Sequence, residues 1–486
     1  MKNTFAPINR IPPEVLSLIP AHCDTDRELI ALTHVCRGLR ELFISHASLW
    51  TYLDCTNVDK TRVYIERSKA SPLEVHLEEY EDIPFLNDAF LLTVPHLGRL
   101  GSLTLSGSSD DVLQLTKYFA SPAPLLKKLR LRFARAETPV IQDAIFDGDL
   151  SSLCELRLYG VITNLAWGNL SNLITFDLRQ VPSNEVSVTR LLDFFERAPL
   201  LRKIHLLDAF PDSSDAPPER VVSLPHLKYL TIAALPVHTI LLNHLLIPTG
   251  ASLHQGFDFV DYKSPILAYL PKTFGNLKNL SHITSISLAF NSGMSLRLGG
   301  PSGTHYVDGN WNGGPITPPT VERRILRSLT QLRISAIERL AITKYHAAQP
   351  LGAAKSPAYE IFLLMNNLRA LTLTLCHNLS FISALNPREN PSETIVCPEL
   401  EELVLHIGSK DWFCINEMLK MVAERASSGA KLSTITIVSL QEFVPAKEVL
   451  KLRNHVSRVK YRLDDSVSAW HIVPADADCT GYESDW

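Results

Sequence analysis

The most regular feature of this sequence is a short hydrophobic phrase that recurs from residue 72 onward. Each copy places apolar residues in the order Leu-x-x-Leu-x-Leu, where x is mostly polar, as in residues 126–131, 201–206 and 368–373. Alternation of apolar and polar residues over so short a stretch predicts a β-strand with one buried face. The first residue of the closing apolar pair falls at positions 75, 103, 129, 156, 176, 204, 230, 257, 286, 340, 371, 403 and 435.

The spacing of this phrase indicates how the strands are connected. Most copies follow one another after 26 to 32 residues, one follows after 20, and the gap of 54 between positions 286 and 340 equals two periods of 27. Stretches between the strands are typical of helices, at 112–119, 188–196, 239–246, 359–365 and 412–426. The pattern resembles leucine-rich repeats. That resemblance implies an α/β fold, a curved solenoid with parallel strands on one face and helices on the other.

Two segments interrupt the repeats. Residues 291–320 are rich in Gly, Pro, Ser and Asn and contain Trp311. We expect a loop there that replaces about one repeat, with residues 295–298 able to form a hairpin with 286–290. It is either a surface insertion or a target-binding loop. Residues 464–486 contain six acidic residues and no Lys or Arg, which predicts disorder.

The first fifty residues follow a different, helical pattern. Pro12 and Pro13 open a short helix that Pro20 ends, and residues 24–26 predict the cap of a second helix. That second helix carries one apolar stripe of Leu29, Leu32, Val35, Leu39 and Leu42, widened by Ile30, Cys36 and Phe43. Apolar residues on two of its sides indicate that one side contacts another chain. The alternative is a small helical cap on a larger domain.

Three parts of this segment resemble an F-box. They are the opening Ile11-Pro-Pro-Glu-Val-Leu-Ser-Leu-Ile19, the centre Leu29–Arg37 with its Val-Cys-Arg, and the closing Ser48-Leu-Trp50. One departure is Leu39, where the family usually has Trp. The resemblance is to F-box proteins with leucine-rich repeats that are abundant in fungi. It implies a small three-helix F-box that docks the Skp-type linker protein of an SCF ubiquitin ligase, and through it a cullin.

The resemblance also assigns residues and boundaries. The expected linker-binding residues are Ile11, Pro12, Pro13, Val15, Leu16, Ile19, Leu29, Ile30, Leu32, Val35, Cys36 and Arg37. Some of them must be core instead, and the pattern does not separate the two sets. The expected organisation is a flexible amino terminus (1–8), the F-box (9–55), a linker with a capping helix at 60–69 (56–72), the solenoid (73–463) and the acidic tail (464–486).

Composition narrows the class of protein. The chain has 486 residues, a formal net charge of −4 and scattered Lys and Arg, which argues against a nucleic-acid or membrane-surface partner. The first residues lack the apolar core of a secretory signal. No uncharged apolar run reaches the length of about 18 residues that a membrane span needs. We therefore expect a cytoplasmic or nuclear protein.

No motif for catalysis is found in the sequence. Phosphate-binding loops, zinc-ligand spacings and nucleophile elbows are missing, and none of the eight cysteines forms a Cys-x-x-Cys pair. The sequence predicts no cofactor, no metal site and no enzyme. The favoured interpretation is a substrate-recognition adaptor of a ubiquitin ligase with an unknown protein target. The alternative is a repeat interaction scaffold without ligase activity.

Alternation along the early strands predicts one polar, concave face. The residues on it include Arg130, Arg132, Arg157, Tyr159, Asp177, Arg179 and His205. Four arginines against one aspartate make this face positive, and guanidinium groups suit carboxylates and phosphates. The hypothesis is that it recognises an acidic or phosphorylated segment of the target. The alternative is a solvated face in which Arg157 pairs with Asp177.

Overall fold

The chain forms an α/β fold with a large, mostly parallel sheet, seen here in a computed structural model. Contacts divide it into two compact units: unit 1 is Met1–Gly256 with Thr273–Lys278, and unit 2 is Phe257–Lys272 with Asn279–Trp486. The structure describes residues 10–23, 25–78, 87–107, 116–133, 140–141, 145–163, 168–181, 187–209, 219–233, 239–260, 275–290, 293–311, 326–327, 329–332, 334–343, 357–374, 378–390, 395–407, 414–439 and 450–463.

Unit 1 holds a parallel sheet whose strands follow the sequence order. Those strands are β1 (Tyr52–Leu53), β2 (Leu73–Glu78), β3 (Leu100–Gly107), β4 (Lys128–Phe133), β6 (Glu155–Tyr159), β8 (Thr175–Val181), β9 (Lys203–Ala209), β11 (Tyr229–Ala233) and the first part of β13 (Ser252–Val260), which unit 1 includes up to Gly256. Shorter strands pair outside this sheet: β5 (Val140–Ile141) with β7 (Ile162–Thr163), and β10 (Val222–Ser223) with β12 (Leu245–Leu246).

The strand register in unit 1 confirms the predicted phrase with one exception. The predicted positions from 75 to 230 are direct neighbours, so that Val75, Leu103, Leu129, Leu156, Phe176, Ile204 and Leu230 form one buried row. The predicted position 257 is wrong, because Leu230 pairs with Leu253. Strand β13 is nine residues long, and Phe257 lies four residues after the position that is in register. The partner of Ile232 is the buried polar residue Gln255, so the apolar pair is interrupted there.

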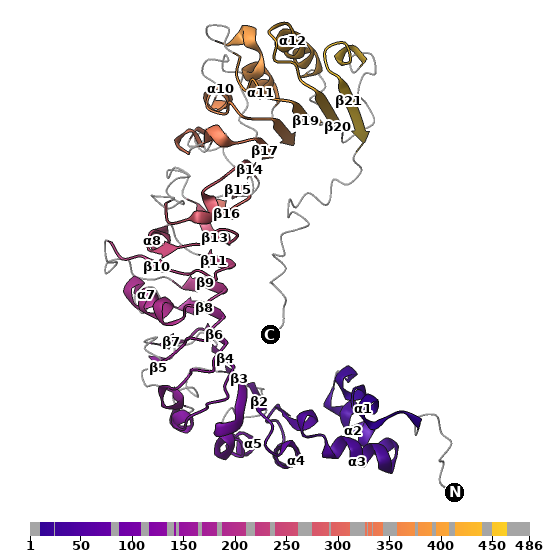
Figure 1. The fold of residues 1–486 in the computed structure, drawn as a ribbon, viewed down its shortest axis with the longest axis vertical. Helices are drawn as coiled ribbons and strands as arrows, with labels where there is room; N and C mark the ends of the chain where they lie inside the picture. Colours follow the sequence, from indigo (N-terminus) through magenta and orange to yellow (C-terminus); the bar gives the residue numbers. More distant parts are fainter. Residues whose placement is uncertain are drawn as a thin grey trace. The chain divides into compact units, whose positions relative to one another are not determined.

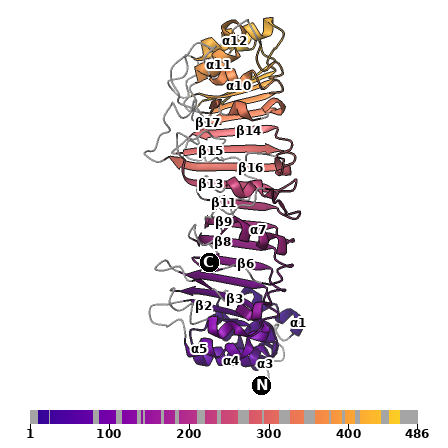
Figure 2. The ribbon, with the colours of Figure 1, turned by 90° about the vertical axis from the view of Figure 1, so that its left-hand side faces the viewer.

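Helices cover one face of the unit 1 sheet (Figures 1 and 2). They are α5 (Asp88–Leu91), η4 (Val94–Arg99), η5 (Thr116–Ala120), η6 (Ile145–Gly148), α7 (Val188–Arg197) and α8 (Thr239–Asn243). In α7, Leu191, Leu192 and the adjacent Phe194 and Phe195 are buried. The ring of Phe194 lies 4.3 Å from that of Phe176 in β8. Each such side chain stabilises the fold by about 1.5–3 kcal/mol.

The predicted helices are confirmed unequally. Helix 188–196 is confirmed, whereas 239–246 is wrong at its end, where β12 begins. The last part of 112–119 is a 3-10 turn, and its first part lies outside the described residues. Helices this short depend on packing against the sheet more than on their own periodicity.

The amino-terminal helical module (residues 11–53) also differs from the prediction. It contains α1 (Pro13–Leu16), η2 (Ile19–His22), α2 (Asp26–Val35), α3 (Arg37–Ser45) and η3 (Ala47–Trp50). The single second helix predicted from Asp26 to Leu42 is wrong, since it breaks at Cys36, which is extended with φ −156°. Its predicted cap is confirmed, because the Thr25 side chain accepts a hydrogen bond from the Glu28 amide. The helix predicted at 60–69 is α4 (Val58–Ser68).

Unit 2 repeats the same arrangement after a local change of strand direction. Its strands are β14 (Ser285–Phe290), β15 (Gly293–Gly300), β16 (Gly303–Trp311), β17 (Arg339–Thr343), β18 (Ala370–Thr374), β19 (Glu402–Ile407), β20 (Thr434–Ser439) and β21 (Arg458–Leu463). Its helices are η9 (Lys278–Leu280), η10 (Leu329–Gln331), η11 (Ile334–Ala336), α10 (Pro357–Phe362), α11 (Asn378–Leu385), η13 (Pro387–Glu389) and α12 (Cys414–Ser427). The predicted positions 286, 340, 371, 403 and 435 are in register, and β21 adds Val459 to this row.

The insertion at 291–320 is a hairpin rather than a loop over its described part. Strand β15 pairs antiparallel with β14, as predicted, and β16 pairs antiparallel with β15. Strand β17 pairs directly with β14, and β15 pairs with the other side of β14. The hairpin thus adds two antiparallel strands and does not occupy the place of a repeat between β14 and β17. The predictions for residues 1–8 and 464–486 lie outside the described residues.

Candidate interaction surfaces

The amino-terminal helical module has a small core to which all five of its short helices contribute. Leu16 of α1 with Leu39 and Phe43 of α3 form a buried cluster, against which Ile19, Leu32, Leu42 and Leu49 pack. Leu39, which replaces the expected Trp, is therefore a core residue. Among the residues expected to bind the linker, Leu16 and Leu29 are buried, and Ile19 and Leu32 are half-buried.

The other expected linker-binding residues are exposed. Val15 is 51 % exposed, Val35 is 62 % exposed, and Ile11 and Ile30 are each 39 % exposed. Pro12, Pro13, Cys36 and Arg37 are exposed as well. Sequence reasoning missed Leu18, which is 62 % exposed. We call Ile11, Val15, Leu18, Ile30 and Val35 the exposed apolar set. On α2, helical spacing separates Ile30 and Ala31 from the buried residues Leu29 and Thr33.

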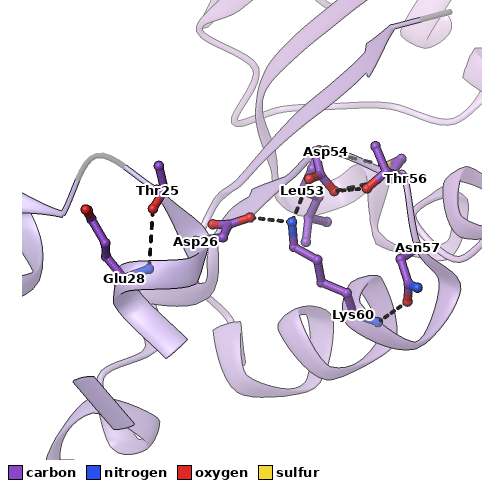
Figure 3. Close-up of polar contacts among 9 residues, drawn as sticks. Thr25, Asp26, Glu28, Leu53, Asp54, Thr56, Asn57 and Lys60 are labelled. Atoms are coloured by element: carbon purple, nitrogen blue, oxygen red, sulfur yellow. Dashed lines mark hydrogen bonds and ion pairs between the residues drawn. The ribbon is translucent and has the colours of Figure 1, made fainter. Parts of the chain in front are cut away.

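The module is attached to the following helix by a charged contact (Figure 3). The Lys60 ammonium group in α4 forms ion pairs with Asp26, at the start of α2, and with Asp54, at 2.6 Å, after β1. Burial alone would raise the pKa of Asp54, but hydrogen bonds from Lys60 and Thr56 outweigh it and lower that pKa. Burial would likewise lower the pKa of Lys60, and its hydrogen bonds to both carboxylates raise it instead.

Trp50 supplies the second attachment. Its side chain is fully buried, and its indole N–H donates to the Phe43 carbonyl at 2.9 Å. The Tyr64 ring of α4 meets the Trp50 ring edge-on at 5.0 Å between centroids. The Arg67 guanidinium lies 4.4 Å from the Trp50 ring centre. The closing Leu-Trp of the sequence motif is therefore the point at which α3, η3 and α4 meet.

The second candidate surface is the polar face of the unit 1 sheet, opposite the buried row. The register places Arg130, Arg157, Asp177 and His205 side by side, and likewise Arg132, Tyr159 and Arg179. All the residues expected at the target-binding face are thus brought together. A third row, Lys128, Glu155, Thr175 and Lys203, was missed. The same strand alternation could have found it.

The carboxylates on this face pair with arginines in an unexpected way. The Nε atoms of Arg130 and Arg157 both lie 2.8 Å from one Glu155 oxygen. Arg179 holds Asp177 with two hydrogen bonds of 2.7 Å each. The ion pairs on this face join Arg157 to Glu155 and Asp177 to Arg179, which differs from the predicted alternative of Arg157 with Asp177.

Burial and neighbouring charges also act on His205. Burial lowers the pKa of His205. Among the charges around it, Asp177 raises that pKa, whereas Arg179, Arg157 and Lys203 lower it. The imidazole is therefore neutral at pH 7, although Asp177 is its direct neighbour on the adjacent strand.

Comparisons with known proteins give no family assignment. No protein-family model matches the chain, and a search of curated proteins gives no significant match. Within the described ranges, no helix combines the length and apolar character needed to cross a membrane. In the same residues, no group of three His, Cys, Asp or Glu side chains is placed to hold a metal ion.

Proposed function

We propose that this protein is a substrate-recognition adaptor of an SCF-type ubiquitin ligase. In this proposal the amino-terminal helical module is an F-box that docks a Skp-type linker, and the leucine-rich repeats bind the target protein. The observation that carries the proposal is the exposed apolar set. Five large apolar residues lie exposed within 25 positions, beside a core that buries other residues of the same motif. Exposed apolar side chains at such density are typical of an interface.

The structure sharpens the choice of residues for a binding test. Leu16 belongs to the buried cluster, so its replacement would disturb folding and binding together. Val15, Ile30 and Val35 are exposed, so their joint replacement by Ser should leave the fold intact. Leu125, Leu200 and Leu450 are also exposed, at 43 %, 41 % and 54 %, and lie outside the module. Their joint replacement by Ser is the matched control.

The test is capture of the purified linker by the full chain. Wild type and control should bind it, and the Val15→Ser, Ile30→Ser, Val35→Ser variant should bind at least about tenfold more weakly, since interface anchors contribute about 1 kcal/mol or more each. A wild-type chain that fails to capture the linker, or a variant that captures it equally well, contradicts the proposal.

The scaffold alternative is separated by a second measurement. The linker-bound chain is mixed with the cullin complex and the ubiquitin-activating and ubiquitin-conjugating enzymes. Ubiquitin transfer to the chain or to a captured protein supports the adaptor. Linker capture without any transfer favours a scaffold without ligase activity.

A further inference from the structure

We propose that the polar face of β4, β6, β8 and β9 binds an extended, anionic segment of a partner protein. The inference rests on the proposed function only in calling that partner the target. The basic face is defined here as Lys128, Arg130, Arg132, Glu155, Arg157, Asp177, Arg179 and Lys203. It contains six cationic side chains and two carboxylates, a net charge of +4, within a chain whose formal net charge is −4.

The positive charge is not neutralised within the face. Glu155 pairs with Arg130 and Arg157 at once, so two cations share one carboxylate of the face. Both carboxylate oxygens of Asp177 accept hydrogen bonds from Arg179. In the described part of the chain, Lys128 and Lys203 form no ion pair, and both are exposed. The Nε–H group of Arg130 donates a hydrogen bond to Glu155, so the two terminal amino groups of Arg130 remain for a ligand.

The geometry of the face suits an extended peptide that crosses the strands. Adjacent strands lie about 4.8 Å apart, so Lys128 and Lys203, three strands apart, are separated by about 14 Å. In an extended peptide, alternate side chains on one side repeat every 6.6 Å or so. Three carboxylates at alternate positions thus span about 13 Å. An acidic stretch with this spacing can place its outer carboxylates at Lys128 and Lys203 and its middle carboxylate between β6 and β8.

The neighbouring residues show the sign of the local field. At His205, three cations, Arg179, Arg157 and Lys203, oppose the single Asp177. At His76 on β2, burial is the main cause of the lowered pKa, and three carboxylates, Glu74, Glu78 and Asp54, oppose Arg130. The excess of cations is therefore a property of the strands from β4 to β9 and not of β2.

A peptide fits these observations better than a nucleic acid. The aromatic rings at the face already carry cations: Arg132 lies 5.3 Å from the Tyr159 ring centre, and Lys203 lies 5.7 Å from the Tyr229 ring centre. Stacking of bases would have to displace them. The net charge of −4 over the whole chain also opposes a long polyanion more than a short acidic segment.

The experiment measures fluorescence anisotropy of a labelled 12-residue peptide with Asp at alternate positions, and of the same peptide with phosphoserine there. The protein is the full chain. Lys128→Glu with Lys203→Glu brings the face to net zero and should weaken binding at least about tenfold. Lys431→Glu with Lys451→Glu makes the same charge change at exposed positions of unit 2 and should change binding less than about twofold. Binding should also fall between low and high salt.

A milder variant guards against misfolding. Lys128→Gln with Lys203→Gln leaves a net charge of +2 and should give an intermediate loss. Capture of either peptide supports the proposal, and the tighter one identifies carboxylate or phosphate as the ligand. Equal binding by wild type and the Glu variant, or tighter binding of a 12-nucleotide single strand than of both peptides, overturns it.

Linker capture is measured on the same preparations to separate the two proposals. The Lys128→Glu, Lys203→Glu variant should capture the linker as wild type does, because neither lysine belongs to the amino-terminal helical module. Failure of wild type to bind the linker, with peptide binding intact, contradicts the adaptor function alone. Linker capture without any peptide binding contradicts the basic face alone.

Discussion

Lys60 has a connecting role that its position in the sequence does not reveal. Its ammonium group meets Asp26, 34 positions earlier, and Asp54, six positions earlier (Figure 3). The two carboxylates come from different segments, α2 and the turn after β1. A lysine on an ordinary helical face has no sequence signal for such a contact, because neither partner lies within one helical turn of it in the sequence.

We predict that Lys60→Met weakens the local stability of α4 by about 1–2 kcal/mol. The side chains are only 23 % to 30 % exposed, so the loss should exceed that of a surface pair and leave two carboxylates close together. The measurement is hydrogen exchange of the α4 amides. Arg62→Met breaks an exposed pair with Asp59 and should change α4 by less than about 0.5 kcal/mol.

The same contact predicts a pH dependence. The pKa of Asp54 is lowered in the folded state, so its contribution is present above the ordinary carboxylate pKa, about 4, and is lost as the pH falls through the lowered value. The pKa of Lys60 is raised, so its contribution is lost only at strongly alkaline pH. The difference between wild type and Lys60→Met should thus persist from pH 5 to 8 or so and shrink below about pH 4. A constant difference down to pH 2 would contradict this assignment.

At the scale of elements, strands were easier to predict than helix ends. The strand positions follow from alternation alone, since one buried face forces a period of two. Strand β16 was missed because Gly303–Trp311 mixes Gly, Asp and Asn with few apolar residues. The break between α2 and α3 was missed because Leu29, Leu32, Val35 and Leu39 keep helical spacing across it. Val35 is exposed, so the continuous stripe does not exist in the fold.

Cys36 accounts for this break. Its backbone is extended, and its Sγ accepts a hydrogen bond from the Leu39 amide at 3.5 Å, which makes it the N-cap of α3. Cysteine is a weak acceptor at a position that favours Ser, Thr, Asp or Asn. A local hydrogen bond of this kind competes with continuation of the helix, and apolar periodicity does not record it.

Substitution at Cys36 tests the break directly. We predict that Cys36→Ser is at least as stable as wild type and that Cys36→Ala is about 1 kcal/mol less stable, because Ala removes the cap. Thermal unfolding monitored by circular dichroism is the measurement. Ala is the best helix former, so a continuous helix would give the opposite order, with Ala the most stable of the three.

At the scale of the whole molecule, the repeat pattern predicted the series of parallel strands in one register, which we call the ladder. It did not predict the division of the chain into two units. Repeats occur on both sides of the division at Gly256 and Phe257, and no sequence signal marks it. Most residues of both candidate surfaces could be selected from the sequence, whereas Leu18 and the row with Lys128 and Lys203 were missed. Their exposure and charge pairing could not, because Leu16 and Val15 are neighbours with opposite environments, and Glu155 pairs across strands.

Removal of one whole repeat tests the ladder. Strands β17 and β18 align Leu340 with Leu371, so deletion of residues 341–371 joins Leu340 to Thr372 and keeps the alternation. This variant should fold, elute as a monomer and retain its β-sheet circular dichroism. Deletion of 341–370 leaves Leu340 beside Leu371, which turns the following side chains to the opposite face. That variant should unfold or aggregate, and equal behaviour of the two would contradict the register.

Because the strands of the ladder share one register, a chain of this kind can gain or lose length only in steps of a whole repeat. Within each unit, successive parallel strands carry the same row of apolar side chains in the same register. If one repeat is removed, the two strands that flanked it can therefore pair with each other. Duplication or loss of a complete repeat therefore creates no new kind of junction. Gain or loss of a single residue inside a strand does. The number of repeats can therefore vary in this architecture while the core contacts between neighbouring repeats stay the same. A binding face that runs across the strands becomes longer or shorter by one strand with each repeat.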